Sequence, residues 1–182
     1  MIPEIGHILL ILTFVASILQ VLFWCFNIKK SDDITINVLI KSTFINFVFI
    51  LFSFGILVYS FIISDFSLVI VSDNSHTLKP LIYKISGTWG NHEGSLMLWI
   101  LILSFFTFLV SRKKHQISYK LLSSIIGIQS LILCLFLSFI LFTSNPFERL
   151  NVLPIDGNGL NPLLQDPGLA LHPPLLYFGY VG

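Results

Sequence analysis

Charged residues are scarce in this 182-residue chain: they make up 10% of it, against about 25% in ordinary soluble domains. Apolar residues make up 55% of the chain, and the mean hydropathy is +0.90. The shortage is concentrated in four long stretches that contain no Asp, Glu, Lys or Arg. This composition excludes a soluble enzyme and a disordered tail, and the formal net charge of +1 provides no basic field for nucleic acid. We therefore expect a protein whose solvent is membrane lipid.

Cysteine is nearly absent as well. The two cysteines, Cys25 and Cys134, lie far apart inside apolar runs, and neither belongs to a CxxC or Cys/His metal-binding spacing. This excludes a disulfide framework and a zinc site built on cysteine. We expect each to be a small, buried apolar residue in a helix.

Four apolar runs are long enough to cross a hydrocarbon core of about 30 Å. They cover residues 5–26, 42–63, 95–111 and 121–143. The first is not a signal peptide, because its leader contains an acid and no base. A fifth apolar stretch, 172–182, is too short to span a bilayer. The sequence therefore predicts an all-α, polytopic helical membrane protein with four complete transmembrane helices plus the start of a fifth. We expect the chain to be the N-terminal part of a larger membrane domain or one half of a split protein.

The distribution of Lys and Arg predicts the orientation in the membrane. The connections between the first and second spans and between the third and fourth spans contain seven bases: Lys29, Lys30, Lys41, Arg112, Lys113, Lys114 and Lys120. The opposite connections contain three bases, Lys79, Lys84 and Arg149, together with six acids. The basic side is therefore predicted to face the cytoplasm or matrix. The N-terminus and the outer loops 64–94 and 144–171 are predicted to face the periplasm or intermembrane space, in a bacterial or mitochondrial inner membrane.

The two outer loops are long for a membrane protein, and function usually lies in such connections. Apolar residues recur at helical spacing over 78–89, which predicts a helix along the interface with Lys79, Lys84 and Ser86 toward water. Three proline-containing turn patterns predict that 144–171 is an ordered loop rather than a helix.

The polar chemistry gathers at the outer side. An ion or proton carrier places charged groups within the bilayer, and the four spans contain none, which disfavours that class. The segment 87–95 has two glycines and predicts a tight turn before the third span. From the residues alone, Trp89 is an interfacial anchor and Glu93 lies near the positive end of a helix.

His172 is the candidate metal ligand, because a neutral imidazole offers an unshared electron pair to iron. Pro173 predicts an extended backbone at His172, which would point the ring away from the helix that follows. The alternative is an ordinary solvated histidine at the membrane interface.

Two segments carry a family resemblance: residues 76–95, HTLKPLIYKISGTWGNHEGS, and residues 161–177, NPLLQDPGLALHPPLLY. Both are similar to the N-terminal part of the CcmF family, the heme lyase subunits of cytochrome c maturation. The resemblance implies an outer-face heme site with two axial histidines, the first of which matches His172. It leads us to expect that the turn with Trp89, Gly90, His92, Glu93 and Ser95 shapes the outer-face vestibule or docks a partner.

The resemblance also implies partners. The family receives heme from the heme chaperone CcmE and holds it while the thiols of apocytochrome c, presented by a CcmH-type partner, add to the heme vinyl groups. The other axial histidine and a tryptophan-rich motif lie downstream in the family, so we expect the chain alone to bind heme weakly and to be inactive without the remainder of the protein. Two alternatives stay open: part of a non-catalytic channel or transporter subunit, and the remnant of a decayed gene.

Overall fold

The computed structural model describes residues 1–27, 29, 32–162 and 165–182. In these ranges the regular elements are all helices: α1 (Ile2–Asn27), α2 (Asp33–Ile62), α3 (Val69–Asn74), α4 (Leu81–Gly87), α5 (His92–Ser111), α6 (Tyr119–Thr143) and α7 (Pro167–Val181). Four of them, α1, α2, α5 and α6, are long and apolar enough to cross a membrane. The predicted all-α fold class and the four spans are confirmed.

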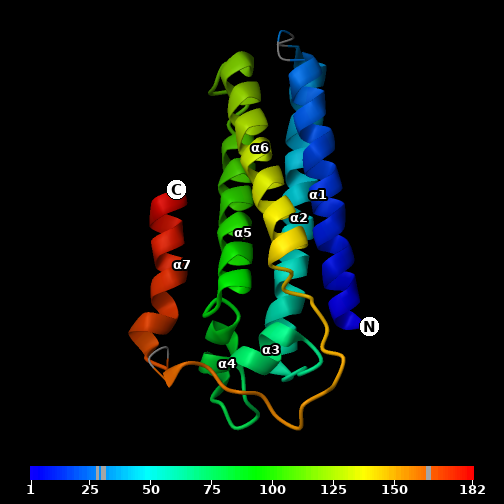
Figure 1. Ribbon diagram of the computed structural model, residues 1–182. Coiled ribbons are helices and arrows are strands. Elements are labelled where there is room, and N and C mark those ends of the chain that lie inside the picture. Colours follow the sequence, from blue (N-terminus) through cyan, green and yellow to red (C-terminus); the bar gives the residue numbers. More distant parts are fainter. Residues whose placement is uncertain (28, 30–31, 163–164) are drawn as a thin grey trace.

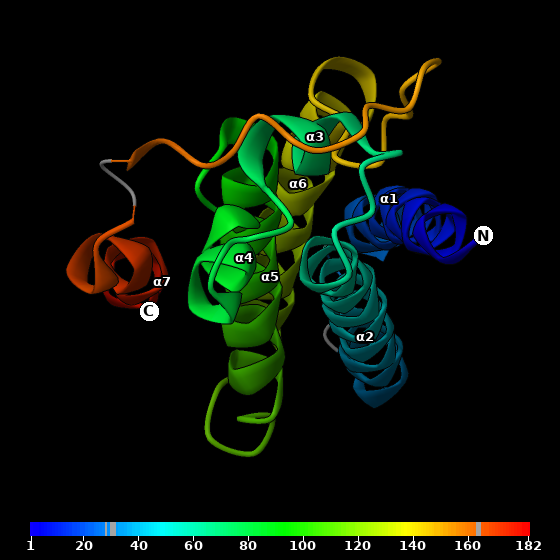
Figure 2. The same cartoon turned by 90° about the horizontal axis from the view of Figure 1, so that it is seen from below.

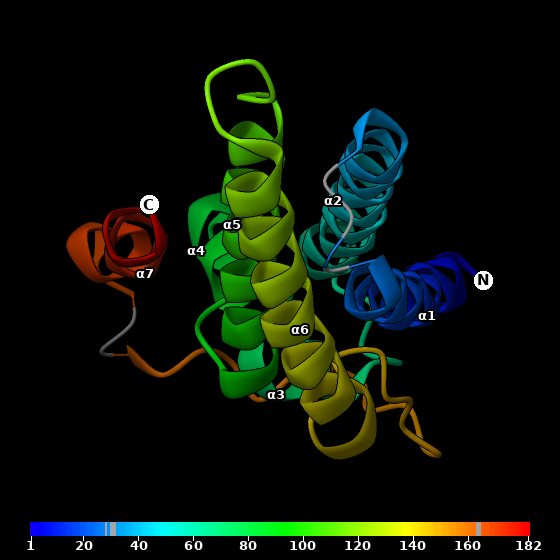
Figure 3. The same ribbon diagram turned by 90° about the horizontal axis from the view of Figure 1, so that it is seen from above.

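The four long helices form one bundle in which α1 packs on α2 and α6, and α5 packs on α2 and α6 (Figure 1). Helices α3 and α4 lie at the end of the bundle where the N-terminus is found, together with the long connection between α6 and α7 (Figures 1 and 2). Helix α7 lies apart from α1 and α2 and contacts α5 and α4 (Figure 3). The bundle therefore holds the two outer segments and the start of α7 at one end.

Three of the long helices, α2, α5 and α6, begin at capping side chains that the apolar pattern alone does not reveal. Asp32, Asn91 and Ser118 each precede a helix, and each side chain accepts a hydrogen bond from a backbone N–H of the first turn. Such caps satisfy donors that have no partner inside the helix. Helix α2 therefore begins at Asp33 rather than at residue 42, because a charged first turn can continue a helix beyond the hydrocarbon core.

The outer segments differ from the predictions in four ways. The 64–94 loop contains a short helix, α3, that was not predicted, and the interfacial helix predicted over 78–89 is limited to α4. Ser86, predicted to face water, is buried, whereas Leu78 is 88% exposed. The last part of the 144–171 loop is helical, because α7 begins at Pro167 rather than at residue 172: Asp166 accepts bonds from the N–H groups of Gly168 and Leu169.

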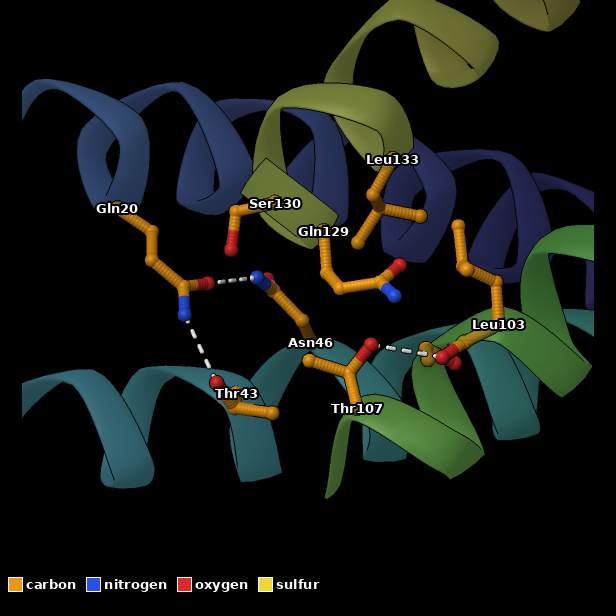
Figure 4. Close-up of a pocket in the computed structure, with 9 residues that line it drawn as sticks. Gln20, Thr43, Asn46, Leu103, Thr107, Gln129, Ser130 and Leu133 are labelled. Atoms are coloured by element: carbon orange, nitrogen blue, oxygen red, sulfur yellow. Dashed lines mark hydrogen bonds between the residues drawn. The ribbon is translucent and has the colours of Figure 1, made fainter. Parts of the chain in front are cut away.

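Polar side chains join the helices inside the bundle. Gln20 of α1 donates from Nε2 to Oγ1 of Thr43 at 2.8 Å, and Asn46 of α2 donates from Nδ2 to Oε1 of Gln20 at 2.7 Å (Figure 4). Near the other end of α1, the Ser53 hydroxyl donates to the carbonyl of Gly6. These neutral groups bond to one another without an ion pair, as expected for polar groups in a lipid-embedded core. The Oδ1 atom of Asn46 is buried and accepts no hydrogen bond from the described residues.

The predicted basic side lies at one end of the bundle, where α1 meets α2 and α5 meets α6 (Figure 1). Lys114 forms an ion pair with Asp33 at 2.6 Å and donates to Oδ1 of Asn37 at 2.8 Å, which joins the α5–α6 connection to α2. Lys30, one of the seven bases, lies outside the described residues.

Candidate functional site at the start of helix α7

Helix α7 carries His172 and has an unusual hydrogen-bonding pattern. Asp166 caps it and Pro167 occupies its first turn, where a missing N–H costs nothing. Pro173 and Pro174 lie inside the helix, where each removes one backbone donor. The prediction of an extended backbone at His172 is wrong: His172 lies within α7, upstream of both prolines.

A tertiary contact compensates for one of the missing donors. In a regular helix, the N–H of residue 174 would bond to the carbonyl of residue 170. Pro174 has no N–H, and the carbonyl of Ala170 instead accepts a hydrogen bond of 2.8 Å from Nε1 of Trp89, 81 residues away in sequence. This bond joins the two sequence segments that carry the family resemblance, and it supplies a donor for the carbonyl that Pro174 cannot serve.

A second polar contact lies further along the same two elements. The hydroxyls of Ser95, in the first turns of α5, and Tyr177, in α7, are 2.5 Å apart. Pro173, Pro174, Tyr177 and Val181 are all half-buried on the side of α7 toward the bundle. The Trp89 bond and the Ser95 bond together fix both the position and the rotation of α7.

The turn that presents Trp89 is closely packed. Asn91 donates from Nδ2 to the carbonyl of Gly87 at 2.7 Å and accepts from the N–H of Gly94 at 2.8 Å. A Cβ atom added to Gly94 would overlap the carbonyl of Thr88. The predicted tight turn is therefore present, and glycine is required at position 94.

His172 itself is exposed, and its ring makes no hydrogen bond or ion pair with any part of the chain that the structure describes. It lies two residues after buried Ala170, and therefore on the opposite side of the helix. Leu169, Leu175 and Leu176 on this side are all exposed. An accessible imidazole among apolar side chains fits one axial position of a heme, whose iron needs a free ring nitrogen and whose ring packs on apolar groups.

The remaining candidate residues do not all join this site. Trp89 and Ser95 contact α7, whereas the exposed His92 packs edge-on against Phe139 of α6, with Nδ1 3.4 Å from the Ser144 hydroxyl. Glu93 lines a small polar cavity of about 80 Å³ whose other lining residues are Val69, Ile70, Asp73, Asn74, Thr143, Ser144, Asn145 and Glu148. The structure gives half-buried Gly90 no contact that assigns it to either group. Within the described ranges, no three His, Cys, Asp or Glu residues are grouped as metal ligands.

Comparison with known proteins identifies the family. Residues 89–182, just over half of the chain, match the model of the family described as Cytochrome C assembly protein. The chain belongs to this family. The match begins at Trp89 and ends beyond His172, so both partners of the contact between the turn and α7 lie inside it.

Individual family members are similar over the whole chain. The cytochrome c-type biogenesis protein CycK of Rhizobium meliloti is 44% identical over 182 residues, and the CcmF proteins of Pseudomonas aeruginosa and Escherichia coli are 43% and 42% identical over 183 residues. Each alignment covers 100% of this chain but only 27% or 28% of the relative. A solved structure of cytochrome c heme lyase CcmF matches with a TM-score of 0.82 at 24% identity, over 100% of this chain and 28% of that one, which shows a shared fold. The chain thus spans a little over a quarter of the length of these proteins.

Asp156 makes a contact between the two outer segments of this cytochrome c assembly protein that the sequence did not predict. Asp156 accepts hydrogen bonds from Oγ1 of Thr77 at 2.5 Å and from its N–H at 3.0 Å, and lies 3.3 Å from Nε2 of His76. The bond from the Thr77 hydroxyl, with smaller contributions from backbone N–H groups, lowers the pKa of Asp156 below its usual value. No spacing pattern indicates this pairing, because the partners are 79 residues apart.

Lys79, predicted to face water, is half-buried near the same contact. Its Nζ donates to the carbonyl of Asn74 at 3.0 Å. Burial lowers the pKa of Lys79 to about 8, because the charged form loses solvation. Lys84 likewise donates from Nζ to the Ser64 hydroxyl at 2.7 Å. Both lysines therefore contribute to the packing of the outer segment.

Proposed function

We propose that the chain is the N-terminal part of an integral membrane protein of cytochrome c maturation, in which His172 provides one axial ligand to heme at the outer face. The observation that carries the proposal is the exposed imidazole of His172 on a helix that Trp89 and Ser95 hold against the bundle. A ligand for a large, rigid cofactor must be held in place by its surroundings, and the two contacts to α7 supply that support.

Each residue of the site has a distinct role in this proposal. His172 binds the iron through a ring nitrogen, and the exposed leucines beside it pack on the macrocycle. Trp89 and Ser95 do not touch the heme: they position α7, which refines the expectation that the turn shapes an outer vestibule. Glu93 and His92 contact other parts of the outer surface, and their role in this proposal is to dock a partner.

Heme is the cargo of this reaction rather than a resident cofactor. When heme is bound, its vinyl groups accept the cysteine thiols of apocytochrome c, and each S–H adds across one C=C bond to form a thioether. The chain's own part is to hold the iron and orient the porphyrin. The second axial ligand comes from the remainder of the protein, heme arrives from the chaperone CcmE, and a CcmH-type partner presents the thiols.

The membrane is the bacterial or mitochondrial inner membrane, with the His172 end of the bundle in the periplasm or intermembrane space. The uneven distribution of bases supports this orientation, because the end opposite His172 carries most of them. Nothing favours the transport alternative, since the described parts of the four spans bury no acidic or basic side chain.

The test replaces His172 in the full-length protein by alanine. The purified variant should lose heme absorbance, and covalent attachment of heme to apocytochrome c should fall by more than about tenfold, because removing a ligand costs at least as much as removing a supporting residue. Added imidazole should restore part of the heme absorbance and part of the attachment activity, because it can bind the iron at the coordination position that the side chain no longer fills.

The matched control is His115→Ala, which removes an exposed histidine at the basic end of the bundle. This variant should retain heme and activity. Equal losses in the two variants, or unchanged maturation with His172→Ala, would reject the assignment of His172.

A further inference from the structure

An apolar groove lies between α2 and α5 near the basic end of the bundle, far from His172. Its volume is about 420 Å³, and it is lined by Ile40, Lys41, Phe44, Ile45, Phe108 and Arg112. Pockets of about 300–1,000 Å³ are large enough for small-molecule ligands. Its two charged residues come from different elements: Lys41 from α2, and Arg112 from the C-terminal cap of α5.

The floor of the groove is aromatic. The ring centroids of Phe44 and Phe108 are 5.6 Å apart, and Phe47 stacks on Phe108 with centroids 5.4 Å apart. Phe44 and Ile45 remain 49% and 45% exposed. The groove therefore offers a firm apolar surface to a flexible apolar chain.

The two cations at the groove have no counter-charge within the chain that the structure describes. Lys41 and Arg112 are exposed, and neither side chain takes part in an ion pair or a hydrogen bond there. The neighbouring Lys114, in contrast, is paired with Asp33. Two free cations beside an apolar groove are complementary to a ligand with an anionic head and an apolar tail.

We propose that this groove binds an anionic phospholipid, with the phosphate between Lys41 and Arg112 and an acyl chain along Phe44, Ile45 and Phe108. Basic pockets between transmembrane helices are a recurrent form of binding site for anionic lipid headgroups. A soluble anion would leave the apolar floor uncovered, and a zwitterionic lipid would place a third positive charge near Lys41 and Arg112.

A second groove on the same bundle provides an internal comparison. It lies between α1 and α2, has a volume of about 370 Å³, and is lined by Ala16, Leu19, Gln20, Phe23, Val38 and Ser42. It contains no charged side chain. This groove should accept acyl chains without preference for the headgroup.

The test uses the full-length protein and native mass spectrometry with phosphatidylglycerol and phosphatidylcholine. The double variant Lys41→Gln/Arg112→Gln should lose one tightly bound phosphatidylglycerol, with the preference over phosphatidylcholine falling about fivefold for each cation removed. The control Lys29→Gln/Lys120→Gln removes the same charge from the same end, outside the groove, and should retain the lipid. Equal losses in both variants would indicate diffuse attraction to a basic surface and overturn the site.

Two further measurements separate the other occupants. Excess glycerol 1-phosphate should not displace the lipid; displacement would mean that the site binds soluble phosphate. A phosphatidylglycerol with a photoreactive acyl chain should label the peptides around Phe44 and Phe108 in the unaltered protein. Labelling that appears only in the α1–α2 groove would mean that another part of the protein fills the α2–α5 groove. This result, obtained with the unaltered protein, would overturn the proposal.

Discussion

Trp89 supplies a hydrogen-bond donor in place of the backbone N–H that Pro174 lacks. A proline inside a helix ordinarily weakens it, because a carbonyl is left without its N–H partner. Here that carbonyl, on Ala170, becomes the acceptor for an indole N–H from the turn before α5. The contact fixes the turn of α7 directly before His172, so Trp89 controls where the proposed ligand lies.

The Trp89 contact is tested by Trp89→Phe, which retains an aromatic ring and removes the N–H. The loss of one hydrogen bond, about 0.5–1.5 kcal/mol, should raise amide exchange in the first turns of α7 by about two- to tenfold. Hydrogen exchange with mass spectrometry of the peptide around His172 measures this. Trp99→Phe is the control, since Trp99 packs on Phe136 in the bundle and should leave α7 unchanged. An unaltered exchange rate in Trp89→Phe would show that the bond does not hold α7.

Asp156 makes the link between the outer segments sensitive to acid. Its pKa is lowered in the folded protein by the bond from Thr77, so the ionised form is favoured by folding. The stabilisation is therefore present above the unfolded pKa, near 3.8, and is lost as the pH falls through the still lower folded value. Proteolysis within 76–80 should stay slow from neutral pH down to about that value and accelerate below it. The Asp156→Asn variant should be cleaved faster than the unaltered protein at neutral pH, and acid should change its cleavage rate little further. If acid accelerates its cleavage as much as that of the unaltered protein, ionised Asp156 does not hold the outer segments together.

The helices differ in how much of each could be predicted from the sequence. The centres of α1, α2, α5 and α6 follow from uninterrupted apolar runs, because only helices satisfy the backbone in lipid. The ends were not predictable from hydropathy: α2 extends to Asp33 and α7 begins at Pro167, since capping by Asp32 and Asp166 depends on local hydrogen bonds. His172 lies inside a helix whose Ala170 carbonyl bonds to Trp89, and no local sequence pattern indicates this distant partner.

The turn before α5 can be tested with two glycine substitutions of opposite expected effect. Gly94→Ala places a methyl group against the Thr88 carbonyl and should destabilise the turn, lowering the thermal stability of the protein in detergent. Gly55→Ala lies on an exposed face of α2 with no atom within 4 Å of the added Cβ, and should be neutral or stabilise the helix by up to about 1 kcal/mol. Scanning fluorimetry of both variants measures the difference. Equal melting temperatures would show that the turn accommodates a side chain.

The bundle as a unit separates two chemical environments. Unpaired bases and the α2–α5 groove lie at one end, and the start of α7, the Trp89 turn and the linked outer segments lie at the other (Figure 1). Between them the described spans contain only neutral side chains, such as the Gln20–Asn46 pair. The proposed heme chemistry requires that the end of the bundle where α7 begins faces the compartment into which apocytochrome c is exported.

This sidedness can be measured with single cysteines in full-length protein whose native cysteines, including Cys25 and Cys134, are replaced by serine. Ile155→Cys replaces a fully exposed residue of the α6–α7 connection, and Lys113→Cys replaces an exposed residue of the α5–α6 connection. A membrane-impermeant maleimide added outside intact cells or spheroplasts should label position 155 at once and position 113 only after permeabilisation. The reverse pattern would place His172 on the wrong side for the proposed function.

The bond between Trp89 and the carbonyl of Ala170 also has an evolutionary consequence. A substitution at position 174 that restored a backbone N–H would let the helix recapture its own acceptor, and selection for an indole at position 89 would then relax. Changes at these two sites should therefore occur together along the branches of a family tree. A chimera that takes the turn from one relative and the helix from another could combine a proline at position 174 with no indole at position 89, and would then lack a donor for the carbonyl of residue 170.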